Sequence, residues 1–260
     1  MVNGTWSLVS GCELADWLFL TCQVHDKSGS LILENGMPKT AFMSIPKTEC
    51  RIIDTWHSGG LRGTGSHDLE LRDVEVPGYR AFDFSEVHEI HSAIARAPAF
   101  CILQCLFAAQ TLGLGQKALD TVIEMARSNI TPGPMPDLRD RADARTGVAR
   151  HKFALEAARN NLYLQVDALW DQIVAGNAPT LVEISTIYGA SMHAIAISTK
   201  TVDCMHALGG TKALYTDSPL ERHHRDLHAM LRHIVAQNMW LEDVGSVMFD
   251  LPPEIPIYAL

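Results

Sequence analysis

The sequence predicts an α+β protein in which a small antiparallel β-barrel or sandwich is followed by a four-helix up-and-down bundle. Short β-like segments separated by turn residues fill the first part of the chain. Near Gly78 the pattern changes, and long stretches with helical apolar periodicity follow. Glycine and proline signals divide these stretches into four helices. The predicted domains are therefore residues 1–80 and 81–260.

Five β-strands are expected in the first domain. They span Thr5–Val9, Trp17–Val24, Thr40–Ile45, Cys50–Trp56 and Leu69–Val76. Clusters of turn residues at 26–29 and 35–38 separate neighbouring strands. Within the last strand the spacing of apolar residues changes at Arg72 and Asp73, which predicts a bulge or a tight turn.

Four long helices are expected in the second domain. They run roughly over Ala97–Arg127, Arg139–Ala175, Pro179–Leu208 and Pro219–Val244. Glycine-containing pairs at 176–177 and 209–210 predict the ends of the second and third helices. The segment 218–221, Ser-Pro-Leu-Glu, predicts a capping box with proline in the first helical position. A proline-rich loop at 131–136 separates the first two helices.

The composition excludes some classes of protein. With 260 residues, a net charge of −9 and a pI near 5.7, the chain offers no basic patch for nucleic acid. The most apolar run, near Phe100 to Ala109, is expected to be too short to span a membrane. The six cysteines form no C-x-x-C pair, and no cleavable signal opens the chain. We therefore expect a cytoplasmic protein with free thiols and no partner in membrane or nucleic acid.

A glycine-rich segment at 59–66 is the first candidate site. Arg62, Thr64 and Ser66 alternate there with glycines, so hydroxyl, guanidinium and backbone N–H donors can come close to a ligand. The spacing matches no phosphate-loop or dinucleotide fingerprint. From spacing alone, a plain turn between two strands is the favoured interpretation.

The stretch from Trp56 to Pro77, with Gly-Leu-Arg-Gly-Thr-Gly-Ser at its centre, resembles the end of the middle β-domain of the acyl-CoA dehydrogenase superfamily. More narrowly, it is similar to the flavin-dependent two-component monooxygenases, such as the 4-hydroxyphenylacetate and dibenzothiophene oxygenases. The resemblance covers essentially the whole chain. It implies that Arg62, Thr64 and Ser66 line a pocket for flavin and substrate.

The resemblance also implies an activity. Reduced flavin, FAD or FMN, would come from a separate reductase and react with oxygen to oxygenate an aromatic or heterocyclic small molecule. The family has a further helical domain of roughly a hundred residues before this point. Its absence before Met1 leads to the expectation of a truncated gene or a partial chain. Such a chain is expected to bind flavin weakly or not at all and to show mostly uncoupled oxidase activity with reduced flavin. Family members assemble as dimers of dimers, so a homotetramer or at least a dimer is expected.

Two further motifs carry roles by resemblance. Trp6 is expected to wall the flavin ring and Ser10 to sit near its N5 atom, although a core tryptophan and a β-bulge at Ser10 are the simpler interpretation of the residues alone. Gly209 and Gly210 are expected to accept the flavin pyrophosphate against backbone, with Arg222 beside them. The nearby Arg-Asp pair at 225–226 is interpreted as a structural ion pair.

Histidines on the last predicted helix complete the candidate set. His233 fits the place where the hydroxylating branch has a histidine, which implies a catalytic role on the substrate side. A histidine merely packed in a helix face is the alternative. His224 and His228 lie four residues apart and share a face, but no third ligand is spaced to close a metal site, so no metal is expected.

Two other functions stay open. A true acyl-CoA dehydrogenase would need a catalytic carboxylate, which is missing near His233 and would have to come from elsewhere, such as Glu183. The third possibility is an inactive oligomerising module. Small residues on the third helix, from Gly189 to Ser198, favour close helix packing and thus assembly.

Overall fold

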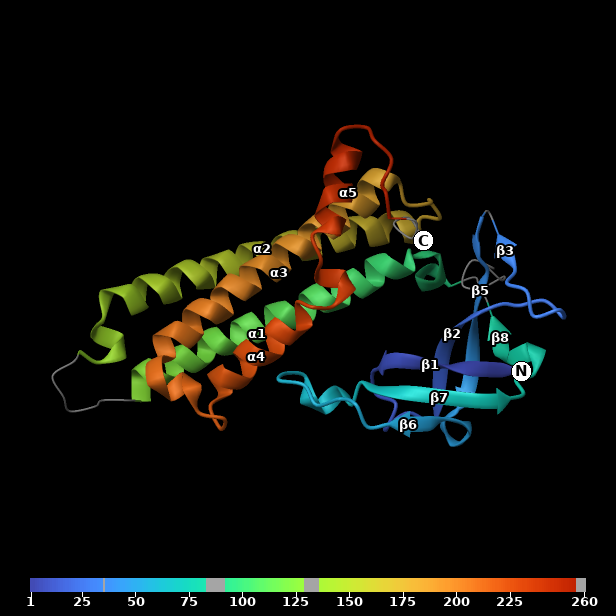
Figure 1. Cartoon of the computed structure of the whole chain (residues 1–260). Helices are drawn as coiled ribbons and strands as arrows, with labels where there is room; N and C mark the ends of the chain where they lie inside the picture. The colour runs from blue at the N-terminus through green and yellow to red at the C-terminus, as the bar shows by residue number, and fades with distance from the viewer. Residues whose placement is uncertain (35, 83–91, 129–135, 256–260) are drawn as a thin grey trace. The chain divides into compact units, whose positions relative to one another are not determined.

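The structure, a computed structural model, describes residues 1–34, 36–82, 92–128 and 136–255. The chain divides into two compact units, Met1–Ile90 and His91–Leu260, and each is described by itself (Figure 1). The first unit is built of antiparallel strands and the second of helices, so the predicted α+β class is confirmed. The first unit extends past the predicted boundary after residue 80.

The first unit contains three small antiparallel sheets. Its strands are β1 (Val2–Val9), β2 (Trp17–Gln23), β3 (Leu33–Glu34), β4 (Met37–Pro38), β5 (Thr40–Pro46), β6 (Arg51–Ile53), β7 (His67–Val74) and β8 (Ala81–Phe82). The sheet orders are β1-β7-β6, β2-β5-β8 and β3-β4. Apolar residues alternate along β2 and β7, so Leu18, Leu20, Leu69 and Leu71 point into one core with Ile45. The five predicted strands are confirmed, whereas the β3–β4 hairpin and β8 were not predicted.

The predicted irregularity in β7 is confirmed as a bulge. The pairing of β1 with β7 shifts register between Val2 and Gly4, opposite Asp73. Asp73 adopts a left-handed conformation with φ of 51°. Its N–H donates to the side-chain oxygen of Asn3 at 2.6 Å, which replaces the lost ladder bond.

The second unit is a group of helices around one central helix. Its long members are α1 (Ala99–Ser128), α2 (Ala142–Val174), α3 (Leu181–Gly209), α4 (Pro219–Met230) and α5 (Met239–Met248). α3 packs against all four of the others (Figure 1). It also carries the most buried residues of these helices, and its sequence is accordingly rich in apolar and small side chains.

The prediction of one unbroken fourth helix is wrong. α4 ends at Met230, and a 3₁₀ turn at Ile234–Ala236 precedes α5. The break falls at His233, whose backbone is extended with ψ of 145° and whose Nδ1 accepts the N–H of Val235. The side chain thus caps a new turn, and the helix cannot continue through this residue.

Helix ends follow the predicted chemistry in part. Gly176, with φ of +88°, ends α2, and backbone bonds from Gly176 to Ile173 and from Asn177 to Gln172 close the end in a Schellman motif. The predicted capping box at Ser218 is not formed, because the Ser218 side chain makes no capping bond. The carboxylate of Glu221 contacts Arg225 at 3.3 Å instead.

A capping box does form at the start of α3. Thr180 Oγ1 accepts the N–H of Glu183, and the Glu183 carboxylate accepts the N–H of Thr180 at 2.7 Å. The predicted start of the third helix at Pro179 is therefore close, but the cap residue is Thr180.

Within the part of the chain that the structure describes, two helices are long and apolar enough to cross a membrane by length and composition, the segments Ala99–Ser128 and Leu181–Leu214. This corrects the expectation that the apolar run near Phe100 is too short. The helices α1 and α3 pack against each other in the core of the second unit, and core helices of this kind pass the same test.

Candidate functional site

Three hydroxyl groups form a connected chain in the first unit. Ser10 Oγ lies 2.8 Å from Ser66 Oγ, and Ser66 Oγ lies 2.7 Å from Thr64 Oγ1. Thr64 Oγ1 donates to the carbonyl of Leu61 at 3.0 Å. Ser66 is buried, whereas Ser10 is exposed at the outer end. The structure thus brings together three of the predicted site residues, from the end of β1 and from the glycine-rich segment.

The glycine-rich segment is held in an unusual backbone path. Leu61 has a φ of 54° and Gly65 a φ of 50°, so the chain turns twice through the left-handed region. The indole N–H of Trp56 donates to the carbonyl of Leu61 at 3.0 Å, and the N–H of Gly11 donates to that of Thr64 at 2.7 Å. These bonds fix the segment against the turn after β1, as a preformed ligand site requires.

Arg62 and Trp6 differ in how freely they face solvent. Arg62 is exposed, and its Nε donates to the carbonyl of Ser58 at 3.3 Å. Trp6 is half-buried over Gly4, and its indole N–H donates to the carbonyl of Thr21 at 2.7 Å. Trp6 is therefore fixed to its own unit, and its role beside a flavin ring stays a prediction.

His67, the first residue of β7, was not among the predicted site residues. This side chain is buried, and its Nδ1 accepts the N–H groups of Thr55 and Trp56, both at 3.2 Å. Because Nδ1 accepts, the neutral ring carries its proton on Nε2, 3.8 Å from a carboxylate oxygen of Glu13. A histidine placed directly after a glycine-rich segment was the available signal. His67 anchors the segment Thr55–Trp56 that leads into the loop.

In the second unit, packing requires glycine at position 209, whereas the backbone conformation favours glycine at position 210. A Cβ at Gly209 would lie 2.6 Å from Leu220 Cδ1, so this position is closed by packing against α4. Gly210 is exposed with φ of 57°, and nothing lies within 4 Å of its Cβ position. Of the two, only Gly210 leaves open backbone for an anion. Arg222, in the first turn of α4, is exposed nearby.

The next residue of α4, His223, is buried among cationic neighbours. Burial lowers the pKa of His223, and the charges of Arg222 and Lys117 lower it further. His223 is therefore neutral near pH 7. It adds no positive charge beside Arg222.

His233 lies beyond the other end of α4. Its side chain is exposed, and the ring centroid is 5.5 Å from that of Phe107 on α1. Because Nδ1 accepts the N–H of Val235, the neutral ring presents Nε2–H outward. This arrangement can donate a hydrogen bond, or take a second proton after a change of partner at Nδ1.

The loop that carries His233 is fixed by side chains that the sequence analysis did not select. Gln104, fully buried on α1, donates to the carbonyl of Val235 at 3.1 Å. The indole of Trp240 donates to the carbonyl of Ile234 at 2.9 Å, and Gln237 donates to the carbonyls of Leu231 and His233. A buried glutamine in an apolar helix was the available signal. These bonds hold His233 at a defined place on its unit.

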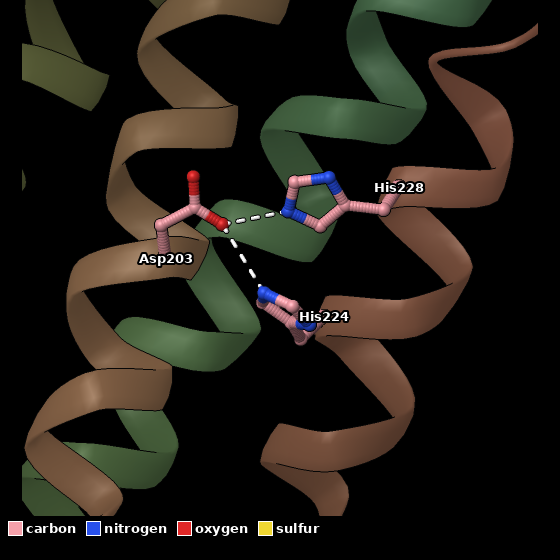
Figure 2. Close-up of side chains that lie close together, drawn as sticks. All are labelled: Asp203, His224 and His228. Carbon is pink, nitrogen blue, oxygen red and sulfur yellow. Dashed lines mark hydrogen bonds and ion pairs between the residues drawn. The ribbon is translucent and has the colours of Figure 1, made fainter.

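The expectation that no third metal ligand lies near His224 and His228 is wrong. Asp203 on α3 points at both rings (Figure 2). Its Oδ1 lies 2.7 Å from His228 Nε2 and 3.4 Å from His224 Nε2. Sequence spacing could not find this residue, because it lies on a different helix and reaches α4 only through the packing of α3 on α4.

The predicted site residues therefore fall into three groups. Ser10, Thr64 and Ser66 form one in the first unit. Gly209, Gly210 and Arg222 lie around the start of α4, and His233 lies past its end. Twelve residues of α4 span roughly 18 Å, so the last two groups lie at opposite ends of this helix.

Comparisons with solved structures place this architecture. XiaF from Streptomyces sp., solved with FADH2 and glycerol, matches with a TM-score of 0.85 and 26% identity over 98% of this chain and 65% of that one. The 3-HSA hydroxylase from Rhodococcus sp. RHA1 matches with a TM-score of 0.82 and 25% identity, over 96% of this chain and 65% of that one. The chain thus has the α+β fold of the corresponding part of these proteins.

Sequence comparisons give the family. The model of the acyl-CoA dehydrogenase C-terminal domain matches residues 105–238. The chain therefore belongs to the acyl-CoA dehydrogenase family. It is 28% identical to indole-3-acetate monooxygenase from Pseudomonas putida, over 97% of this chain and 63% of that protein. It is 26% identical to the oxygenase component of FADH(2)-dependent resorcinol hydroxylase from Rhizobium sp., over 95% of this chain and 62% of that protein. The chain spans less than two thirds of these relatives.

Proposed function

We propose that this chain takes part in flavin-dependent monooxygenation of an aromatic or heterocyclic small molecule. Several similar proteins are named as monooxygenases or hydroxylases, and two of these names or descriptions contain FADH2. The observation that carries the proposal is His233. It is an exposed imidazole whose Nδ1 accepts a backbone N–H and whose Nε2 has no partner among the described residues, and buried side chains hold its loop at a defined place.

The residues present fit a reduced flavin. Gly210 leaves backbone open with no atom within 4 Å of its Cβ position, and Arg222 supplies an exposed positive charge for phosphate. The exposed Ser10 hydroxyl would contact N5 of the ring, and Arg62 with Thr64 would shape the pocket. We favour FAD over FMN because two relatives are described with FADH2. When bound, the reduced flavin supplies the electrons that activate oxygen for transfer to substrate.

Two side chains of this chain, His233 and Glu183, decide which reaction the protein could support. His233 would donate a hydrogen bond from Nε2–H on the substrate side and keep the activated oxygen hydrogen-bonded. It would deprotonate a phenol at Nε2 only after its own proton moves to Nδ1, which breaks the bond from the Val235 N–H. Glu183, the carboxylate that a dehydrogenase would need, is committed to the capping box of α3. Hydrogen bonds from Thr180 hold the pKa of Glu183 below its ordinary value, which makes it a weak base. The monooxygenase function is thus better supported than the dehydrogenase function.

The proposal also includes the role of each domain, a partner protein and a location in the cell. We place the flavin and substrate pocket in a β-barrel-like domain, and flavin binding and assembly in an up-and-down bundle of α1 to α4. A separate flavin reductase supplies the reduced cofactor, as the names of relatives that are oxygenase components suggest. All six cysteines are free, which supports a cytoplasmic location. The inactive oligomerising module is the outcome that would hold if no flavin bound.

The test is an anaerobic titration of the purified chain with reduced FAD and reduced FMN, followed by mixing with oxygen and indole-3-acetate or resorcinol. We expect reduced FAD to bind more tightly than FMN, and a hydroxylated product to form in mass spectrometry. Product without added reductase is expected when the flavin is reduced chemically. Reduction of bound oxidised flavin by an acyl-CoA in place of product formation would show a dehydrogenase, and no binding of either flavin would contradict the proposal.

A further inference from the structure

A cluster of four polar side chains lies between α3 and α4, apart from the groups assigned to flavin. α3 contributes Asp203 and His206, one helical turn apart. α4 contributes His224 and His228, also one turn apart. The ring of His224 stacks on that of His206 and lies tilted against that of His228. Helical spacing of i, i+3 on one helix and i, i+4 on the other directs the four side chains to one place.

The three candidate ligand atoms lie close enough together to surround one ion. Tetrahedral Zn²⁺ with bonds of about 2.0–2.1 Å separates its ligand atoms by roughly 3.3 Å. Asp203 Oδ1 lies 3.4 Å from His224 Nε2 and 2.7 Å from His228 Nε2. One ligand atom from each of the three residues lies within 4.8 Å of the others. Small side-chain rotations therefore bring all three to bonding distance.

The chemistry and the surroundings also suit a metal. Two imidazoles and one carboxylate are the ligand types that Zn²⁺ binds, and three protein ligands leave a fourth position for water. The side chains of Asp203, His224 and His228 are 46%, 37% and 36% exposed, so an ion can enter from solvent. The ring of His206 lies against that of His224, with centroids 4.2 Å apart and planes at 27°, which limits the rotation of His224.

We propose that Asp203, His224 and His228 form a binding site for Zn²⁺ or a similar divalent transition metal, which joins α3 to α4 (Figure 2). The ion would link the two helices that flank Gly209–Gly210 and would restrain the start of the loop that carries His233. Metal binding is measurable without flavin and without any activity assay.

The experiment uses the whole chain without a polyhistidine tag, stripped with EDTA and exchanged into chelator-free buffer. Zn²⁺ is titrated by calorimetry, and Co²⁺ is titrated by visible absorption, because tetrahedral Co²⁺ gives intense bands that octahedral Co²⁺ lacks. We expect one equivalent of Zn²⁺ per chain, tetrahedral-type Co²⁺ bands, and a Tm that rises on adding Zn²⁺.

The variants are Asp203→Asn and His228→Asn, with His193→Ala as the matched control. His193 is an exposed histidine on α3 outside the cluster. Loss of a ligand is expected to weaken Zn²⁺ binding by at least about tenfold, since even outer partners of a metal site cause such losses. It should also abolish the Co²⁺ bands, whereas His193→Ala should change neither.

Circular dichroism of each metal-free variant checks folding. If one ligand variant is unfolded, the other carries the test, because the two side chains lie on different helices. Equal Zn²⁺ affinity in wild type, Asp203→Asn and His228→Asn would overturn the proposal. So would the absence of stoichiometric binding, and the cluster would then be a hydrogen-bonded histidine–aspartate group only.

Discussion

His233 combines exposure with a fixed orientation, and this combination sets its chemistry. The Val235 N–H occupies Nδ1, so Nε2 alone faces outward. A side chain held in this way can act at one atom without losing its place, as catalysis by positioned groups requires. The family resemblance identified the residue, but the sequence placed it on a continuous helix. Only the break after Met230 shows that His233 lies outside the helix and that its side chain caps the turn that follows.

The first prediction concerns this histidine. His233→Ala should leave the affinity for reduced flavin within a few-fold, because the residue does not hold the cofactor. Substrate oxygenation should fall by a factor of about 10² or more, the usual contribution of a positioned acid or base. Hydrogen peroxide release should rise correspondingly and is measured beside product formation. His193→Ala is the control, and equal small effects from both variants would return His233 to a packing role.

The second prediction separates the paired glycines. Gly209→Ala should destabilise the protein by about 1–3 kcal/mol, because the new Cβ meets two buried side chains, Leu220 and Ala213, that cannot move away. Gly210→Ala should cost a similar amount, about 1–3 kcal/mol, from its backbone conformation alone. Thermal unfolding of double variants tells them apart. Leu220→Val should partly rescue Gly209→Ala and leave Gly210→Ala unchanged.

At the scale of helices and strands, the sequence predicted those features that depend only on neighbouring residues in the chain. The end of α2 follows from the conformational freedom of Gly176, and the bulge in β7 follows from a change of apolar spacing at Arg72–Asp73. The break after α4 depends instead on tertiary packing. Gln104 and Trp240 bind the carbonyls of the intervening loop from other helices. No periodicity within α4 and α5 records those bonds, so a continuous helix was the natural and wrong prediction.

The third prediction tests the capping box at the start of α3. Thr180→Ala should destabilise the protein by about 1 kcal/mol at neutral pH, the usual cost of losing an N-cap. The pKa of Glu183 is lowered in the folded state by hydrogen bonds from Thr180. The stabilisation of the folded protein by ionised Glu183 is therefore complete above the ordinary glutamate pKa. It is lost as the pH falls through the lowered pKa of the folded state.

The difference in Tm between wild type and Thr180→Ala should accordingly narrow in acid. Thermal scans across the acid range provide the measurement. Ser218→Ala is the matched control, because the Ser218 side chain makes no capping bond and its removal should change the Tm little. A gap between wild type and Thr180→Ala that widens in acid would contradict the assigned capping box.

At the scale of the whole molecule, the surface expected to join copies of this chain lies on α2 and not on α3. The small residues of α3 were expected to serve contacts between copies, but most of them are buried within the unit. Gly189, for example, faces Val244 of α5, with its Cβ position 3.6 Å from the valine side chain. Among the helices, α2 carries the largest set of exposed large apolar side chains: Phe153, Tyr163, Leu164, Trp170 and Val174. A dimer or tetramer stays a prediction, now with a different contact face.

The fourth prediction follows from that face. Phe153 and Leu164 are 67% and 64% exposed, and eleven residues bring them to the same side of α2. Light scattering at micromolar concentration should show a dimer or tetramer for the wild type. Phe153→Glu with Leu164→Glu should give a smaller species with unchanged circular dichroism. A monomeric wild type in light scattering would contradict the predicted dimer or tetramer.

The hydroxyl chain in the first unit has a polarity that sets what its outer end can recognise. Each hydroxyl has one proton, and Thr64 directs its own to the carbonyl of Leu61. Ser66 must then donate to Thr64, and Ser10 to Ser66. Ser10 therefore presents lone pairs outward. It favours a partner that carries a hydrogen, and reduced flavin carries one on N5 whereas oxidised flavin does not.

The direction of the hydroxyl hydrogen bonds would thus let Ser10 distinguish reduced from oxidised flavin, without any proton transfer to the flavin. Thr64→Val removes the anchor, so that Ser66 and Ser10 can reverse their donation and Ser10 can serve oxidised flavin as well. The ratio of the two flavin affinities should then fall by roughly fivefold, the value of one net hydrogen bond of about 1 kcal/mol. Equilibrium titrations with oxidised and reduced flavin measure this ratio, and an unchanged ratio would show that the chain has no fixed direction.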